Sequence, residues 1–139
     1  QLTDIAMRAL SPSLNDPTTA VHTIGHLASL LGLVAQRDAG AVRRVQGEHE
    51  VRLLERVTSR EDTIAGVCRP IVRAGASHPE VLLAVADMLT YLRSRAPDLA
   101  PALADEGHYV ARAGERSLPD PDDRAMVVAR LRGVASPRR

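Results

Sequence analysis

Apolar residues recur at spacings of three and four along most of the chain, and this period predicts a series of amphipathic helices. The stretches between them are rich in Pro, Gly, Asp and Ser, which start or stop helices. The first three predicted helices cover residues 2–10, residues 17 to about 37, and a stretch that begins after Thr58 or Ser59 and ends by Ser77. The last three cover residues 79 to about 95, a stretch capped by Asp98 that runs to about residue 116, and a stretch that begins at Asp120.

The second predicted helix is the most apolar of the series, and residues 17–36 contain no Asp, Glu, Lys or Arg. One side of its helical wheel carries the main apolar stripe, which consists of Ile24, Leu27, Ala28, Leu31 and Val34. The opposite side gathers His22, His26, Ser29 and Leu33. Gly25 and Gly32 lie between the two sides, where they would let another backbone approach closely. We expect a helix with so few charges to be central and packed on more than one side.

The pattern changes between the second and third helices. Residues 42–46 and 49–53 flank Gly47-Glu48, which favours a short hairpin with Gly47 in the turn, although residues 51–54 could instead belong to a helix. The predicted fold class is therefore all-α, a helical bundle of about six helices with one small β-hairpin between the second and third helices. Residues 1–135 would form a single soluble domain, and residues 136–139 a disordered tail.

Composition narrows the classes of function. There is no Phe or Trp, so the core must consist of Leu, Val, Ile and Ala. All 18 basic residues are arginines, they are spread among 17 acids, and the net charge is +1, which argues against nucleic-acid binding. The single cysteine, Cys68, excludes an intrachain disulfide and suits a reducing compartment.

No uninterrupted apolar run reaches the roughly 18–20 residues that span a bilayer. The chain nevertheless begins at Gln1, inside a predicted helix and without Met. We therefore expect it to be a piece of a longer protein.

The stretch from Arg8 to Ala20 is the densest in residues with specific backbone roles, and we call residues 11–16 the elbow. Ser11 precedes a proline and should end the first helix, while Asp16 should cap the second, with Pro17 at its first position. Polar side chains in and beside the elbow are the candidate ligand or partner surface: Asp4, Arg8, Ser11, Asn15, Asp16, Thr18 and Thr19. These groups could serve only as caps, with Arg8 paired to Asp4, or they could form a polar pocket or docking surface.

The run LTDIAMRALSPSLNDPTTA, residues 2–20, resembles the signature of a bacterial family of predicted membrane proteins with a domain of unknown function. The matching positions are Asp4, Ile5, Ala6, Arg8, Ala9, Leu10, Ser11, Pro12, Asn15, Asp16, Pro17, Thr19 and Ala20. Ser13 stands where the family usually has Gly, and Gly25 where it often has an acid. The resemblance implies an N-terminal multi-pass membrane portion followed by a soluble region, of which this chain is the last part. It implies no reaction.

His22 and His26 are spaced i, i+4, so on a helix they could chelate one metal ion. The glutamate that serves as general base in zinc proteases of this spacing is missing, and a third ligand would have to be Asp16 or His49. No phosphate loop, nucleophile elbow or cysteine-based metal motif is present in the sequence.

Two hypotheses follow. The first is a non-enzymatic soluble domain, for regulation, ligand sensing or oligomerisation, of a multi-pass protein in the bacterial inner membrane. It would lie on the cytoplasmic side, need no cofactor, and contact its own membrane portion and further copies of itself. The alternative is a metal-dependent hydrolase or metal-binding regulator that holds a divalent metal through His22, His26 and Asp16.

Overall fold

The structure is a computed structural model that describes residues 1–36 and 58–135. Its elements are α1 (Leu2–Ala9), α2 (Pro17–Ala35), α3 (Arg60–Ala74), α4 (Pro79–Arg95), the 3-10 turn η1 (Pro97–Leu99), α5 (Ala100–Ser117) and α6 (Pro121–Ala135). Over the described ranges the chain is all-helical, as predicted, with six α-helices. The hairpin expected between residues 42 and 53 and the expected tail at 136–139 lie outside the described residues.

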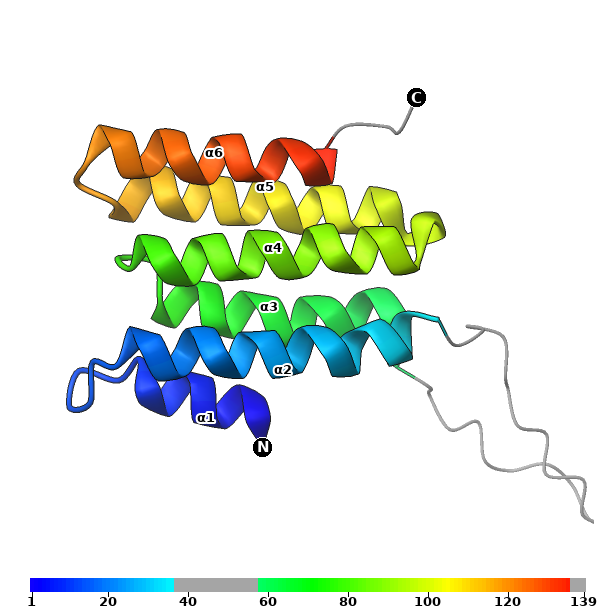
Figure 1. The fold of residues 1–139 in the computed structure, drawn as a ribbon, viewed down its shortest axis with the longest axis horizontal. Coiled ribbons are helices and arrows are strands. Elements are labelled where there is room, and N and C mark those ends of the chain that lie inside the picture. The colour runs from blue at the N-terminus through cyan, green and yellow to red at the C-terminus, as the bar shows by residue number, and fades with distance from the viewer. Residues whose placement is uncertain (37–57, 136–139) are drawn as a thin grey trace, which may run out of the picture.

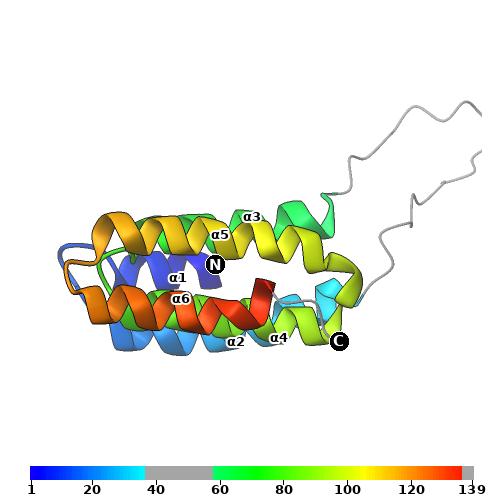
Figure 2. The same ribbon diagram turned by 90° about the horizontal axis from the view of Figure 1, so that it is seen from above.

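Consecutive helices run antiparallel, and the elbow, the α3–α4 turn and the α5–α6 turn lie at the same end of the bundle (Figure 1). Seen from above, the helices form two layers, with α1, α3 and α5 in one and α2, α4 and α6 in the other (Figure 2). The most extensive helix contacts, α2 with α4, α4 with α6, α1 with α2 and α5 with α6, agree with this arrangement. The fold is therefore three antiparallel helix pairs laid side by side.

The centre of the core is α4, because it contacts α2, α3, α5 and α6. Its buried residues include Val81, Leu82, Val85, Ala86, Met88, Leu89 and Leu92. The second helix packs on more than one side, as predicted, since it contacts α1, α3 and α4, but the prediction that it is central is wrong. Helix α2 lies at an edge of its layer, and although its apolar stripe packs on α1 and α4, its opposite side is exposed (Figure 1). Hydrophobic periodicity identifies the buried side of a helix, but it does not reveal how many neighbours surround it.

Local capping chemistry explains most helix boundaries. Asp16 caps α2 and Ser59 caps α3, each by accepting a backbone N–H three residues later, as predicted. Asp120 accepts the N–H of Asp122 at the start of α6. The prediction that Asp98 caps the fifth helix is wrong, because η1 precedes α5 and the Asp98 carboxylate binds Arg60 instead.

Among the described residues, α2 is the one helix long and apolar enough to cross a membrane by length and composition alone. Polar residues such as Thr23 and His26 interrupt its apolar run, but none of them is Asp, Glu, Lys or Arg, so its average hydropathy stays high. In this fold, 39% of its most apolar window is buried against the bundle. By its packing, α2 is one helix of a bundle with an unusually apolar outer side.

Candidate functional site

The elbow is closed by backbone hydrogen bonds rather than by the side chains that the sequence suggested. The amide of Asp16 donates to the carbonyl of Ala9 at 2.7 Å, and the amide of Asn15 donates to the carbonyl of Ser11 at 2.8 Å. Asn15 has a φ of 44°, in the left-handed region that Asn tolerates better than most residues. Asn15 therefore supplies the conformation that reverses the chain, and the amide of Asp16 satisfies the end of α1.

Asp16 acts as a helix cap with both of its carboxylate oxygens. Oδ1 accepts the backbone N–H of Thr19 at 3.0 Å, and Oδ2 accepts the Thr19 hydroxyl at 2.6 Å. These bonds, the hydroxyl's first, hold the pKa of the Asp16 carboxyl below its ordinary value. The structure thus brings Asp16 and Thr19 together and accounts for both by the geometry of the helix start.

Of the remaining candidates, the structure brings Asp4 and Arg8 together, since both line a hollow of about 280 Å³ with Gln1 and Ile5. The Ser11 hydroxyl lies 3.0 Å from that of Ser13, which sequence reasoning had not selected. Thr18, Asp4 and Arg8 are exposed, and the ion pair predicted between Asp4 and Arg8 does not form in the described part of the chain. A role for the elbow as a binding surface remains a prediction that these contacts do not test.

His22 and His26 lie on the exposed side of α2. Within residues 1–36 and 58–135, no group of three or more His, Cys, Asp or Glu side chains is placed to hold a metal ion. The proposed ligand Asp16 is engaged with Thr19, and His49 lies outside the described residues. The geometry therefore adds nothing in favour of a metal site.

The exposed side of α2 carries no charged Asp, Glu, Lys or Arg and includes two exposed leucines. It consists of His22, His26, Ser29, Leu30 and Leu33, which we call the outer face of α2. Leu30 is 50% exposed and Leu33 is 58% exposed, and α2 carries no charged side chain that would solvate this face. An exposed face without charge is a candidate interaction surface.

A groove of about 320 Å³ lies beside the outer face, between α2 and α4. Its lining is mostly apolar and consists of Val21, Ile24, Gly25, Ala28, Ala84, Asp87, Met88 and Tyr91. A Cβ at Gly25 would meet nothing within 4 Å, whereas a Cβ at Gly32 would lie 2.8 Å from the ring of Tyr91. The expectation of close backbone approach is thus wrong at Gly32, where an aromatic side chain packs instead, and Gly25 lies open beside the groove. Sequence reasoning missed this groove, although the spacing of the two glycines was a signal.

Sequence reasoning also missed an ion pair between α3 and α5, in which the buried carboxylate of Glu106 meets the half-exposed guanidinium of Arg69. Glu106 is 4% exposed, and its carboxylate accepts Arg69 Nε at 3.1 and 3.2 Å and Arg69 Nη2 at 2.6 Å. The guanidinium lies 5.5 Å from the centre of the Tyr109 ring, and the hydrogen bonds that it donates to Glu106 raise the pKa of Arg69. The signal was available, because Glu106 falls on the apolar stripe of Leu103 and Val110. The ion pair links α3 to α5.

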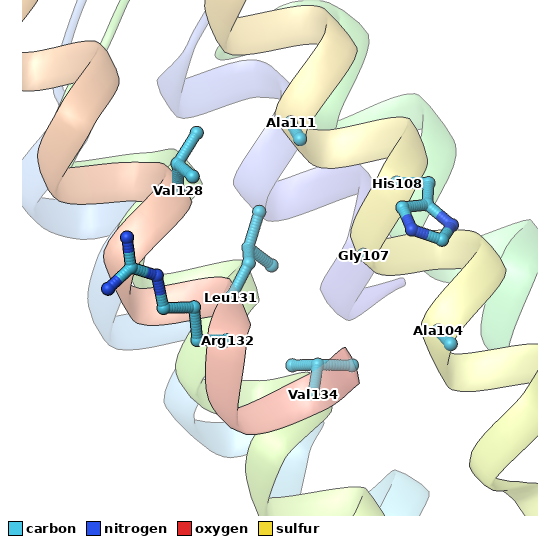
Figure 3. Close-up of a pocket in the computed structure, with 8 residues that line it drawn as sticks. All are labelled: Ala104, Gly107, His108, Ala111, Val128, Leu131, Arg132 and Val134. Carbon is cyan, nitrogen blue, oxygen red and sulfur yellow. The ribbon is translucent and has the colours of Figure 1, made fainter. Parts of the chain in front are cut away.

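An apolar hollow of about 180 Å³ lies between α5 and α6 (Figure 3). Leu131 and Val134 point into it, while His108 and Arg132 lie on opposite rims with their side chains turned away (Figure 3). Because no polar groups converge there, the hollow offers no arrangement for chemistry.

Comparison with known proteins bears directly on the resemblance drawn from residues 2–20. The family described as predicted membrane protein (DUF2254) matches residues 1–91. Uncharacterized proteins of Mycobacterium tuberculosis and Mycobacterium bovis are each 33% identical to the chain over 130 residues, which cover 92% of this chain and 25% of theirs. The chain thus spans about a quarter of the length of these relatives. No solved structure matches it.

Proposed function

The chain belongs to the family of predicted membrane proteins (DUF2254), and from this premise we propose that it is a non-enzymatic docking domain of a longer bacterial membrane protein. It would lie on the cytoplasmic side of the inner membrane and use the outer face of α2 to regulate or assemble the membrane portion. The relatives are about four times as long as the matched region, which leaves ample chain for such a portion.

One observation carries this proposal: a charge-free helix at the edge of the bundle leaves two leucines half exposed or more beside an apolar groove. Because each leucine is already about half buried, a covering surface would supply roughly half of the 1.5–3 kcal/mol of full burial, about 0.8–1.5 kcal/mol for each. The outer surface of α5, which carries Arg112, Glu115 and Arg116, shows how the same chain solvates a face that stays in water.

The metal-dependent alternative through His22, His26 and Asp16 gains no observation that favours it. Asp16 already accepts two hydrogen bonds from Thr19.

Photo-crosslinking in bacteria that express the full-length protein tests the proposal. A benzophenone amino acid would replace Leu33 on the outer face, and a matched variant would carry it at Glu115, an exposed residue of α5. We expect position 33 to crosslink to the membrane portion or to another copy, identified as a crosslinked peptide by mass spectrometry. Equal yields from positions 33 and 115 would overturn the proposal.

A further inference from the structure

One stripe of α2 changes from buried to exposed part of the way along the helix. It consists of Thr23, Leu27, Leu30 and Val34. Spacings of four, three and four residues keep these side chains within about 60° of one another around the helix. Thr23 and Leu27 are each 6% exposed, whereas Leu30 is 50% exposed and Val34 is partly exposed. The stripe is therefore covered in its first half and much less covered in its second half.

Helix α1 is the neighbour on this side of α2. Gly25 and Ala28, which line the groove beside α4, lie more than about 120° around the helix from the middle of the stripe. The stripe thus faces away from that groove. The other helix with extensive contacts to α2 is α1, and the amide of Asp16 donates to the carbonyl of Ala9 where the two helices meet.

The described part of α1 is too short to reach the second half of the stripe. The bond between Asp16 and Ala9 sets the end of α1 level with the start of α2. At 1.5 Å per residue, α1 rises about 10 Å from Ala9 back to Leu2, whereas Leu30 lies about 20 Å along α2. Helix α2 accordingly continues well past the N-terminus of α1 (Figure 1). Leu30 lies beyond Leu2 in the direction in which preceding residues would continue α1.

Resting on the proposed docking function, we infer that about ten residues preceding Gln1 in the full-length protein continue α1 as one helix and cover Leu30 and Val34. The relatives are about four times as long as the matched region, which leaves chain for this segment. Gln1 forms no side-chain cap, and its carbonyl already accepts the N–H of Ile5, so it does not interrupt a longer helix. Any other partner would have to share this space with the chain that enters α1.

The continued helix should repeat the pattern on the inner side of α1. Leu2, Ala6 and Ala9 are spaced by four and three residues, and both alanines are buried. The same spacing leads to positions three and seven residues before Leu2, and the second of these lies about level with Leu30. We expect apolar side chains at both positions of the full-length sequence. Charged residues at both positions would overturn the inference.

Photo-crosslinking from Leu30 in the full-length protein tests where the segment lies. A benzophenone amino acid would replace Leu30, and a matched variant would carry it at Met126, which is 47% exposed on α6. We expect position 30 to form adducts within the same molecule, in the peptide that immediately precedes Gln1, and position 126 to form none there. Adducts of position 30 that map only to other peptides or to another copy would overturn the inference, as would the lack of any adduct.

Melting temperatures give a second readout, free of crosslinking. The 139-residue chain, which has its own core, would be compared with a chain extended by about fourteen preceding residues of the natural sequence, or two heptads. Leu30→Ala should lower the melting temperature by about 4 °C or more in the extended chain and by less than about 2 °C in the shorter one, because only the extended chain buries Leu30. Leu33→Ala, outside the stripe, is the matched control and should have the same effect in both chains. Equal effects of Leu30→Ala in the two chains would overturn the inference.

The two crosslinking positions separate this inference from the function on which it rests. If position 30 fails to reach the preceding segment while position 33 still crosslinks to the membrane portion, the docking function stands and this inference fails. If position 30 reaches the segment while positions 33 and 115 give equal yields, the segment covers Leu30 and the docking function fails.

Discussion

Three glycines of the bundle differ in the space around them, and Gly→Ala substitutions should separate them. Gly25 in α2 and Gly66 in α3 lie within helices, and an added Cβ at either would meet nothing within 4 Å. Gly75 ends α3, and an added Cβ would lie 2.5 Å from Val81 Cγ1 and 3.2 Å from Leu10 Cδ1. An added methyl group would therefore extend into open space at Gly25 and Gly66, and into filled space at Gly75.

The expected magnitudes follow from these surroundings. Glycine inside a helix is about 0.8–1 kcal/mol less favourable than alanine, so Gly25→Ala and Gly66→Ala should each raise the free energy of unfolding by about that much. For a chain of this size, the melting temperature should rise by roughly 2–6 °C. Gly75→Ala should lower the free energy of unfolding by roughly 1–3 kcal/mol, because buried, β-branched Val81 has little rotamer freedom with which to move aside.

Urea unfolding followed by far-ultraviolet circular dichroism, at a few micromolar protein, measures all three effects. Gly66→Ala is the matched control for Gly25→Ala, because it makes the same change at an equally open position on another helix. The reasoning is refuted if Gly25→Ala lowers the free energy of unfolding, since the space beside Gly25 would then be filled.

Three further predictions concern single side chains. Asp16→Ala should lower the melting temperature at pH 7. Because folding depresses the Asp16 pKa, the difference in melting temperature from the wild type should shrink as the pH falls below about 4. A difference that does not depend on pH would contradict the capping role. Ser59→Ala removes the acceptor for the Asp62 N–H and should lower the free energy of unfolding by about 1 kcal/mol in urea titrations, whereas no change would show that the cap is dispensable. Burial raises the pKa of the Cys68 thiol to about 12, so the thiol should react with a disulfide reagent at pH 8 only after unfolding. The free energy of unfolding should decline as the pH rises above about 9, because the thiol ionises first in the unfolded chain. Fast labelling of the native chain would refute this prediction.

The sequence predicted the helices well because their ends depend on neighbouring residues. Asp16 and Ser59 bond to amides three positions on, and Pro79 opens α4 where the pattern placed it. Asp98 is an aspartate like Asp16, but it does not cap a helix. Its carboxylate binds Arg60, which lies 38 positions earlier in the sequence. Arg60 also donates to the carbonyl of Ala35 at the end of α2. A contact of that range leaves no trace in local spacing.

The candidate site was predicted less well, and for a related reason. The sequence pointed to the elbow because residues with specific backbone roles are concentrated there. In the structure, backbone hydrogen bonds and the Asp16 cap account for much of the elbow's geometry. The outer face of α2 needed two facts that periodicity does not contain. One is that α4, and not α2, occupies the centre of the bundle, and the other is that Tyr91 fills the space beside Gly32 but leaves Gly25 open.

The position of α2 in the fold gives its composition a physical reason. A helix in the centre needs no charges because other helices cover every side, but α2 is at an edge and still carries none. In a domain that works alone, charged residues on the outer face would improve solubility at no cost to the core. A face without charge and with two exposed leucines is instead what an interface requires when it is buried in an assembly. Bundle packing accounts for the apolar stripe of α2, and the proposed docking function would account for the lack of charge on its outer face.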